Sequence, residues 1–312
     1  MDLAIHAERL SRVYPGSTGA PALDRLDLDI PVGQVYGLIG RNGAGKTTFV
    51  RIAATQLKAT GGSMTVLGHD VDRDPGPIRE RIACIPQESR PLYFLTVDEL
   101  VFLYLRMRGL EHADARRRTR DILAELDLTD VAHRLVNRLS GGQRRRAMVA
   151  MVLASDAELL FLDEPTTGLD PLARREVWGA VRRAQREHRT VLLTTHYLDE
   201  AEALSARLAL LEGGRLVVEG TPADLRARVR RPFRVRLEGT VPRAELEPYG
   251  EVSAVDGGYL VFGGESAARE LAQEGLRRGL RVSLGPVSLE DIFLQLVGRS
   301  IDEDAPLEGD DR

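Results

Sequence analysis

The chain has 312 residues, enough for one large or two modest domains, and its net charge of -4 argues against a nucleic-acid-binding protein led by electrostatics. Its single cysteine, Cys84, allows no internal disulfide, which fits a reducing compartment, and is most simply a small buried side chain. There is no N-terminal signal pattern and no run of about 18 apolar residues, so we expect no direct membrane span.

The first elements are two predicted antiparallel strands. Residues 2–8 and 26–30 alternate apolar and polar side chains, as half-buried strands do. Tyr14 lies in the turn region between them. A lone tyrosine there is usually a surface aromatic, but ahead of a phosphate-binding loop it can stack on an adenine ring.

A phosphate-binding loop follows the apolar strand predicted at 35–39 and precedes a helix predicted from Thr48. The loop has the pattern G-x-x-x-x-G-K-T, and strand, glycine loop and helix are the context that this pattern requires. Its residues are Gly40, Arg41, Asn42, Gly43, Ala44, Gly45, Lys46 and Thr47. Its glycines let backbone N–H groups surround an anion, Lys46 would reach the outer phosphates, and the Thr47 hydroxyl would ligate Mg²⁺.

Strands and helices then alternate, which predicts an α/β fold with a largely parallel sheet covered on both faces. A capping box at 96–99 opens a helix, and Pro171 starts another at its first turn. The expected strands are 62–67, 82–85, 159–162, 190–194, 207–211 and 215–219, and a charged helix is expected at 113–126.

Beyond a basic linker at 226–231, the pattern indicates a second, smaller domain. Its elements run strand, helix, strand, strand, helix, strand, which is the ferredoxin-like plan. The expected ranges are 233–238, 242–248, 251–255, 259–263, 265–278 and 280–285. An amphipathic helix at 289–297 and an acidic tail predicted to be disordered complete the chain, giving domains 1–230 and 231–298 and a tail at 299–312.

Four polar residues follow the predicted strands where ligands bind in open parallel sheets. Asp163 would hold Mg²⁺ through water, and Glu164 would orient and deprotonate an attacking water. Gln87 would reach the metal and that water, and His196 would contact the γ-phosphate. Taken singly, Gln87 is most simply a surface residue and His196 a structural one. Because the four residues occur in this order at the ends of successive strands, we favour a role in ATP hydrolysis.

These residues make the chain resemble an ATP-binding-cassette (ABC) ATPase over residues 2–230, with antiparallel and helical subdomains. Leu139 to Gln143 reads LSGGQ, the signature of that family, and residues 160–171 match its Walker B and D-loop run. The resemblance places further nucleotide contacts on Tyr14, Thr48, Ser140, Gly141, Gly142, Gln143 and Asp170, with Gln87 as the Q-loop residue and His196 as the switch histidine. Arg41 stands where the family often has proline, with little expected effect.

The resemblance implies a homodimer that sandwiches ATP. Each ATP would lie between one chain's phosphate loop and the other chain's signature, where Ser140 and the backbone N–H of Gly142 would grip the γ-phosphate. All motifs are intact, which favours two competent sites. Leu92 to Leu95 are read equally well as core or as part of a groove for a permease helix.

The subfamily follows from two further stretches. Residues 196–202 resemble the switch region of exporter ATPases, and residues 288–293 resemble the end of the extension in daunorubicin-resistance-type subunits. The resemblance implies export of a hydrophobic drug, antibiotic or lipid through a separate transmembrane permease, at the cytoplasmic face of the membrane. The alternatives are a soluble ABC ATPase acting on ribosomes or DNA, and an importer ATPase. The second domain is expected to be non-catalytic and to contact a second copy through the helix at 289–297.

Overall fold

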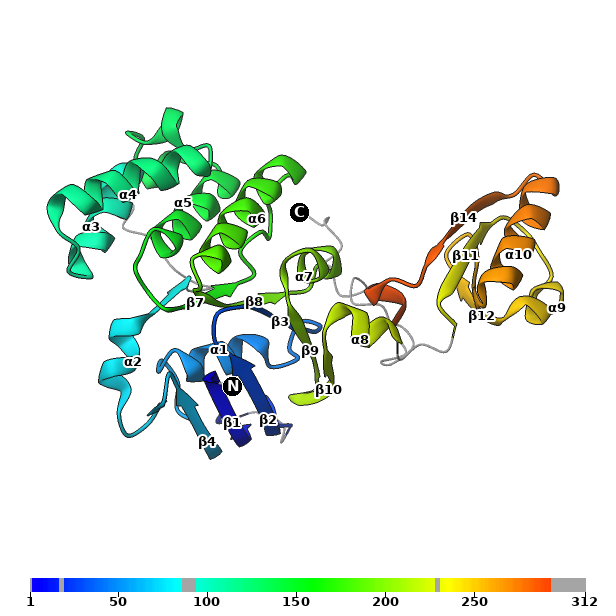
Figure 1. Cartoon of the computed structure of the whole chain (residues 1–312), viewed down its shortest axis with the longest axis horizontal. Helices are drawn as coiled ribbons and strands as arrows, with labels where there is room; N and C mark the ends of the chain where they lie inside the picture. The colour runs from blue at the N-terminus through cyan, green and yellow to red at the C-terminus, as the bar shows by residue number, and fades with distance from the viewer. Residues whose placement is uncertain (1, 17–19, 86–93, 228–230, 293–312) are drawn as a thin grey trace. The chain divides into compact units, whose positions relative to one another are not determined.

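The computed structural model describes residues 2–16, 20–85, 94–227 and 231–292. They form two compact units, which divide between Glu219 and Gly220 (Figure 1). Since residues 228–230 and 293–312 lie outside the described ranges, the predicted domain ends at 230 and 298 and the disordered tail stay predictions. Within the described ranges, no helix is both long and apolar enough to cross a bilayer.

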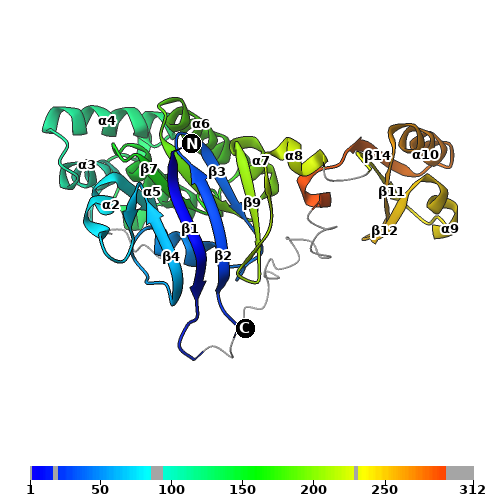
Figure 2. The same cartoon turned by 60° about the horizontal axis from the view of Figure 1, so that its bottom comes forward.

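The first unit contains an antiparallel sheet with strand order β2-β1-β4-β5. Figure 2 shows β4, β1 and β2 side by side. Its strands are β1 (Leu3–Arg12), β2 (Leu23–Pro31), β4 (Gly61–Val66) and β5 (His69–Asp70). The first two run longer than predicted, because the pairing shifts register between Ala7 and Leu10, and Arg9 and Arg25 have positive φ. These irregularities break the two-residue alternation on which the prediction relied.

A six-stranded sheet with order β10-β9-β3-β8-β7-β6 carries the candidate site. Strand β3 pairs in parallel with β8 and β9, and β7 pairs in parallel with β6 and β8. The strands are β3 (Val35–Ile39), β6 (Ile82–Ile85), β7 (Leu159–Asp163), β8 (Thr190–Thr195), β9 (Arg207–Glu212) and β10 (Arg215–Gly220). Parallel pairing brings the carboxyl ends of β3, β6, β7, β8 and β9 to one edge, as the sequence predicted.

Helices cover the six-stranded sheet. They are α1 (Lys46–Ala53), α2 (Pro75–Arg81), α3 (Val97–Met107), α4 (His112–Glu125), α5 (Gly141–Leu153), α6 (Pro171–Arg186) and α7 (Leu198–Leu204), with 3-10 turns at Thr129–Val131 and Val136–Arg138. Side chains of α1, the antiparallel sheet and β7 share one core, while those of α3 to α6 share another with the six-stranded sheet. Figure 1 shows α5 and α6 on one side of β7 and β8, and α1 on the other side. The sequence did not predict α2, whose Pro-Gly-Pro start is typical of a turn, or the short α7.

The second unit begins with α8 (Pro222–Ala227), which the sequence placed partly in a linker. Thr221 and Asp224 cap its start, with the Thr221 N–H donating to Asp224 at 3.0 Å. The strand order β12-β13-β11-β14 and the two intervening helices match the predicted ferredoxin-like plan. The elements are β11 (Phe233–Glu238), α9 (Arg243–Leu246), a 3-10 turn (Glu247–Tyr249), β12 (Glu251–Val255), β13 (Gly258–Gly263), α10 (Glu265–Arg277) and β14 (Arg281–Pro286).

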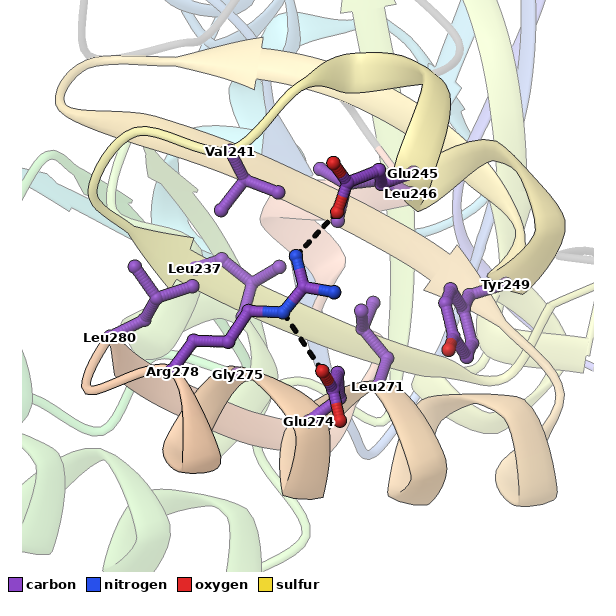
Figure 3. A pocket seen from close by; sticks show the side chains of 10 residues that line it. All are labelled: Leu237, Val241, Glu245, Leu246, Tyr249, Leu271, Glu274, Gly275, Arg278 and Leu280. Carbon is purple, nitrogen blue, oxygen red and sulfur yellow. Dashed lines mark hydrogen bonds and ion pairs between the residues drawn. The ribbon is translucent and has the colours of Figure 1, made fainter.

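A small cavity lies between α9 and α10 in this unit (Figure 3). The guanidinium of Arg278 bridges its two sides, donating to Glu274 at 2.9 Å and also to Glu245. The cavity holds about 40 Å³, far below the size of a drug-sized ligand pocket. Leu289 and Ile292, expected at a dimer contact, are buried within the chain; Phe293 and Leu296 lie outside the described residues.

Candidate nucleotide-binding and hydrolysis site

The loop between β3 and α1 has a backbone that only glycine accommodates at two positions. Gly45 has a φ of +106°, and a Cβ there would lie 2.5 Å from the Ala22 carbonyl oxygen. A Cβ on Gly40 would lie 2.4 Å from the Leu211 carbonyl oxygen. Tight packing against these neighbours holds the loop in a shape that exposes its N–H groups at the start of α1, where an anion is favoured.

Lys46 is buried at the first position of α1, with only 5% of its surface exposed. Its ammonium donates to the carbonyl oxygens of Gly40 at 2.6 Å and Arg41 at 3.0 Å. Burial lowers its pKa, while the carboxylates of Glu164 and Asp163 act in the opposite direction. A buried cation in an anion-binding loop is stabilised when phosphate arrives.

A pocket of about 600 Å³ opens over this loop, within the size range of small-molecule sites. Its lining is Tyr14, Ala22, Asn42, Gly43, Ala44, Gly45, Lys46, Thr47, Thr48 and Glu164. The Tyr14 hydroxyl lies 3.3 Å from the Thr48 hydroxyl, and the Arg12 guanidinium lies 5.0 Å from the Tyr14 ring centre. The structure therefore places the predicted adenine-stacking ring at the same pocket as the phosphate loop.

Asp163 ends β7 beside the loop, 2% exposed. Its carboxylate accepts hydrogen bonds from the Thr47 hydroxyl at 3.4 Å and from the Thr194 hydroxyl. Burial raises the pKa of Asp163, and these two hydroxyls partly oppose that rise. A threonine hydroxyl beside a carboxylate fits Mg²⁺, which takes few protein ligands and keeps water and phosphate oxygens.

Among the described residues, no group of three His, Cys, Asp or Glu side chains could enclose a metal ion. A Mg²⁺ ion at Thr47 and Asp163 would therefore depend on the nucleotide for further ligands, as is usual for this ion. Gln87, the third predicted ligand, lies outside the described residues.

Glu164 carries its carboxylate on the pocket side. Oxygen Oε1 lies 3.4 Å from Nδ1 of His196, and Oε2 accepts from the Thr167 hydroxyl at 3.3 Å. The hydrogen bond to His196 lowers the pKa of Glu164 below its usual value, so it is ionised at neutral pH. Glu164 also has a φ of +49°, which is unusual for a residue with a side chain.

The signature segment forms the start of α5. The Ser140 hydroxyl accepts from the Gln143 N–H at 3.2 Å, and the Gln143 side chain accepts from the Ser140 N–H at 3.1 Å. Of the residues that line the phosphate-loop pocket, none comes from 140–143. The Asp170 side chain caps α6 without a reciprocal bond, accepting from the N–H groups of Leu172 and Ala173 at 3.0 Å.

Two residues near the site were missed by the sequence reasoning. Thr194, in β8, bonds Asp163 through its hydroxyl and accepts from the Glu164 N–H at 3.0 Å through its carbonyl oxygen. Thr194 could have been found from the sequence, because polar residues end an apolar strand there, just before His196. Arg145 reaches the backbone of Asp163 and Glu164, but its place in an arginine run gave no signal.

Comparison with known proteins decides the family. Daunorubicin/doxorubicin resistance ATP-binding protein DrrA of Streptomyces peucetius is 38% identical, covering 96% of this chain and 94% of that protein. Residues 23–167 match the family described as ABC transporter. The chain belongs to the ABC transporter family. Nod factor export ATP-binding protein I of Cupriavidus pinatubonensis is a further ABC relative, 37% identical over 88% of this chain and 86% of that protein.

Solved ABC structures match the same fold. One described as the ATP-binding subunit of an ABC transporter has a TM-score of 0.66 and 27% identity, covering 73% of this chain and 93% of the other. A dimeric bacterial ABC transporter cassette has a TM-score of 0.65 and 25% identity, covering 70% of this chain and 98% of the other. The predicted ABC fold is confirmed, and the chain is an ABC ATPase that binds ATP.

Proposed function

We propose that this ABC ATPase powers the export of a hydrophobic compound, such as a drug, an antibiotic or a lipid, through a separate membrane permease. The observation that carries the proposal is the near-complete coverage of relatives whose names state drug resistance and Nod factor export. That coverage includes the C-terminal unit as well as the cassette, so the resemblance is not limited to the motifs that all ABC ATPases share. The work takes place at the cytoplasmic face of the membrane.

The site residues divide the chemistry among them. The loop from Gly40 to Thr48, with Lys46, binds the phosphates, and Tyr14 stacks on the adenine. Thr47, Asp163 and Gln87 hold Mg²⁺, which neutralises phosphate charge when bound. Glu164 takes a proton from the attacking water, and its lowered pKa keeps it ready as a base. The 3.4 Å contact with His196 supports the role of that histidine in aligning Glu164 with the γ-phosphate.

The signature residues act on the partner's nucleotide in a homodimer. The phosphate-loop pocket takes no lining from residues 140–143, which supports a second copy as the source of that half of the site. Ser140 and Gly141 are exposed, so the positive N-terminal end of α5 is accessible to a nucleotide held by a second copy. Ser140 and Gly142 bind the γ-phosphate there, and Gly141, Gln143 and Asp170, the N-terminal cap of α6, complete the nucleotide contacts.

The permease docks against the exposed side of α3. Leu103 and Met107 are one helical turn apart, 40% and 83% exposed, and Phe94 nearby in the sequence is 71% exposed. Large exposed apolar side chains on one helix are typical of a docking surface. Leu95 is partly buried against the core, which supports the core reading for that residue, whereas the exposure of Phe94 supports the groove reading. Leu92 and Tyr93 lie outside the described residues.

The test reconstitutes the chain with a candidate six-span permease, sought in the neighbouring reading frames. Inverted membrane vesicles should take up daunorubicin only when ATP is supplied, and a Glu164→Gln chain in the same vesicles should abolish uptake. ATPase activity that responds to ribosomes or DNA, with no ATP-driven uptake, would instead support the soluble ABC class. Uptake that requires an external binding protein would support an importer.

A further inference from the structure

Helix α5 connects two parts of the hydrolysis machinery. Its N-terminal cap is Ser140. Arg145, about one and a half turns later, contacts the end of β7 in the same chain. The Arg145 guanidinium donates through Nη2 to the carbonyl oxygens of Asp163 and Glu164, both at 2.5 Å. Arg145 is half-buried, and burial lowers its pKa while the charges of Asp163 and Glu164 oppose that shift.

The backbone that Arg145 holds is strained. Glu164 has a φ of +49°, which costs about 1 kcal/mol or more for a residue with a Cβ. Such a conformation persists only where the surrounding structure over-determines it, and here contacts hold the peptide on two sides. On one side, the Glu164 N–H donates to the Thr194 carbonyl oxygen at 3.0 Å. On the other side, its carbonyl oxygen accepts from Arg145.

This peptide conformation determines where the Glu164 carboxylate lies. With both peptide ends held, the carboxylate lies 3.4 Å from His196 and 3.3 Å from the Thr167 hydroxyl. A relaxed φ would rotate the side chain away from these partners. Displacement of a reacting group by about 1 Å can cost about 100-fold in rate.

We propose that Arg145 is a positioning residue for hydrolysis, acting through the peptide of Glu164 in its own chain. The positioning role itself is argued within one chain. Only the assignment of its effect to one chain of a mixed dimer rests on the proposed ATP-sandwich dimer. Arg145 is carried on the helix whose first residues bind the partner's nucleotide, yet it serves the hydrolytic site of its own phosphate loop. It therefore links the two sites of the dimer through a single helix.

The first test measures the homodimer. Arg145→Met should lower kcat by about 10- to 100-fold while the Kd for ATP stays within about 2-fold, since a positioning defect affects the transition state. Arg145→Lys, which can still donate to both carbonyl oxygens, should recover part of kcat. Arg146→Met is the matched control, because Arg146 lies next along α5 but pairs with Glu176 at 2.8 Å and Leu126 at 3.0 Å.

The control separates positioning from fold damage. Both methionine variants should lower the melting temperature to a similar extent, whereas only Arg145→Met should lose hydrolysis with ATP binding intact. Equal losses of kcat in the two variants, or a matching loss of ATP affinity in Arg145→Met, would overturn the proposal.

The second test asks in which chain Arg145 acts. A mixed dimer of a Lys46→Ala chain and a Ser140→Arg chain has one site that combines an intact loop, Asp163 and Glu164 from the second chain with an intact signature from the first. Adding Arg145→Met to the Ser140→Arg chain should remove most of the activity. Adding it to the Lys46→Ala chain should leave most of it.

The reverse pattern would show that Arg145 works by holding the helix of Ser140, and equal losses would show a general structural role; either would overturn the proposal. A parent mixed dimer that assembles but has no activity would count against the shared site instead. In that case the homodimer comparison of kcat with Kd decides the role of Arg145 by itself.

Discussion

The Thr194 hydroxyl donates a hydrogen bond to the buried carboxylate of Asp163 across the paired ends of β8 and β7. The Thr194 carbonyl oxygen also accepts a hydrogen bond at 3.0 Å from the N–H of Glu164, the residue that follows Asp163. One residue of β8 thus orients the predicted metal ligand and the predicted base. The arrangement keeps a carboxylate where burial opposes its charge, as is common at functional sites.

Asp163→Asn should abolish Mg²⁺-dependent hydrolysis without destabilising the nucleotide-free protein. Burial raises the pKa of Asp163 in the folded state, so the unfolded chain ionises first as pH rises and stability falls. Asparagine removes that charge but keeps an oxygen for Thr194 and Thr47. Differential scanning calorimetry at pH 7 without Mg²⁺ should give an equal or higher melting temperature. The control, Asp163→Ala, should melt lower, and an asparagine variant that melts equally low would contradict this account.

Glu164→Gln should bind ATP but hydrolyse it about 10²–10⁴ times more slowly, because the general base is lost. ATP should then hold the dimer together, so size-exclusion chromatography with ATP and Mg²⁺ should show a dimer peak that persists. Lys46→Ala is the control and should remain monomeric in the same buffer. Turnover at the wild-type rate by Glu164→Gln would remove Glu164 from the mechanism.

The ionisation of Glu164 predicts a pH dependence of stability. Its pKa in the folded state lies below the ordinary 4.5, chiefly through the hydrogen bond to His196. A lowered pKa contributes stability above the unfolded value, and this contribution is lost as pH falls through the folded pKa. Urea unfolding of wild type and Glu164→Gln should differ by a constant amount above about pH 5.5 and converge below about pH 4.5. A gap that widens on acidification would contradict the sign.

Gly275 lies in α10 where the helix packs closely on its sheet. A Cβ there would lie 2.7 Å from the Leu237 side chain and 2.8 Å from the Val282 side chain. Gly275→Val should therefore destabilise the C-terminal unit by about 1–3 kcal/mol through overpacking. Gly264→Ala is the control, since a Cβ at Gly264 has open space and its φ is -70°. Urea unfolding, monitored by far-UV circular dichroism, should show a lower midpoint for the valine variant alone.

The sequence predicted the parallel sheet, and with it the common edge for Lys46, Asp163, Glu164 and His196, because buried strands and glycine loops have strong local patterns. It failed where tertiary packing overrides local pattern. The positive φ of Arg9 allows β1 to continue past a register shift that alternation cannot show. Leu289 and Ile292 are buried within the chain, whereas helical spacing alone had suggested them for a dimer contact.

The same contrast between local pattern and tertiary packing applies to the residues of the candidate site. Motif spacing predicted site residues at the ends of strands, where position along the chain fixes position in space. Arg145 was not predicted, because its contacts with the backbone of Asp163 and Glu164 depend on the approach of α5 to the end of β7, which no local pattern encodes. An arginine run such as residues 144–146 is ordinarily a solvated face, and only the structure separates Arg145 from its neighbours.

The shared site is tested most directly by mixing two inactive proteins, Lys46→Ala and Ser140→Arg. If each ATP needs Lys46 from one chain and Ser140 from the other, each homodimer has two defective sites, while a mixed dimer has both defects in one site and leaves the other intact. ATPase activity should therefore return on mixing, at no more than one working site per mixed dimer. Cross-linking in the same sample should show that mixed dimers form with ATP.

A single-chain fusion of two copies, with Lys46→Ala in one copy only, serves as the control for strict coupling between the sites. Activity in that fusion together with restored activity on mixing is the result that the account predicts. Mixed dimers that form with ATP but stay inactive, beside a fusion that hydrolyses ATP, would contradict it.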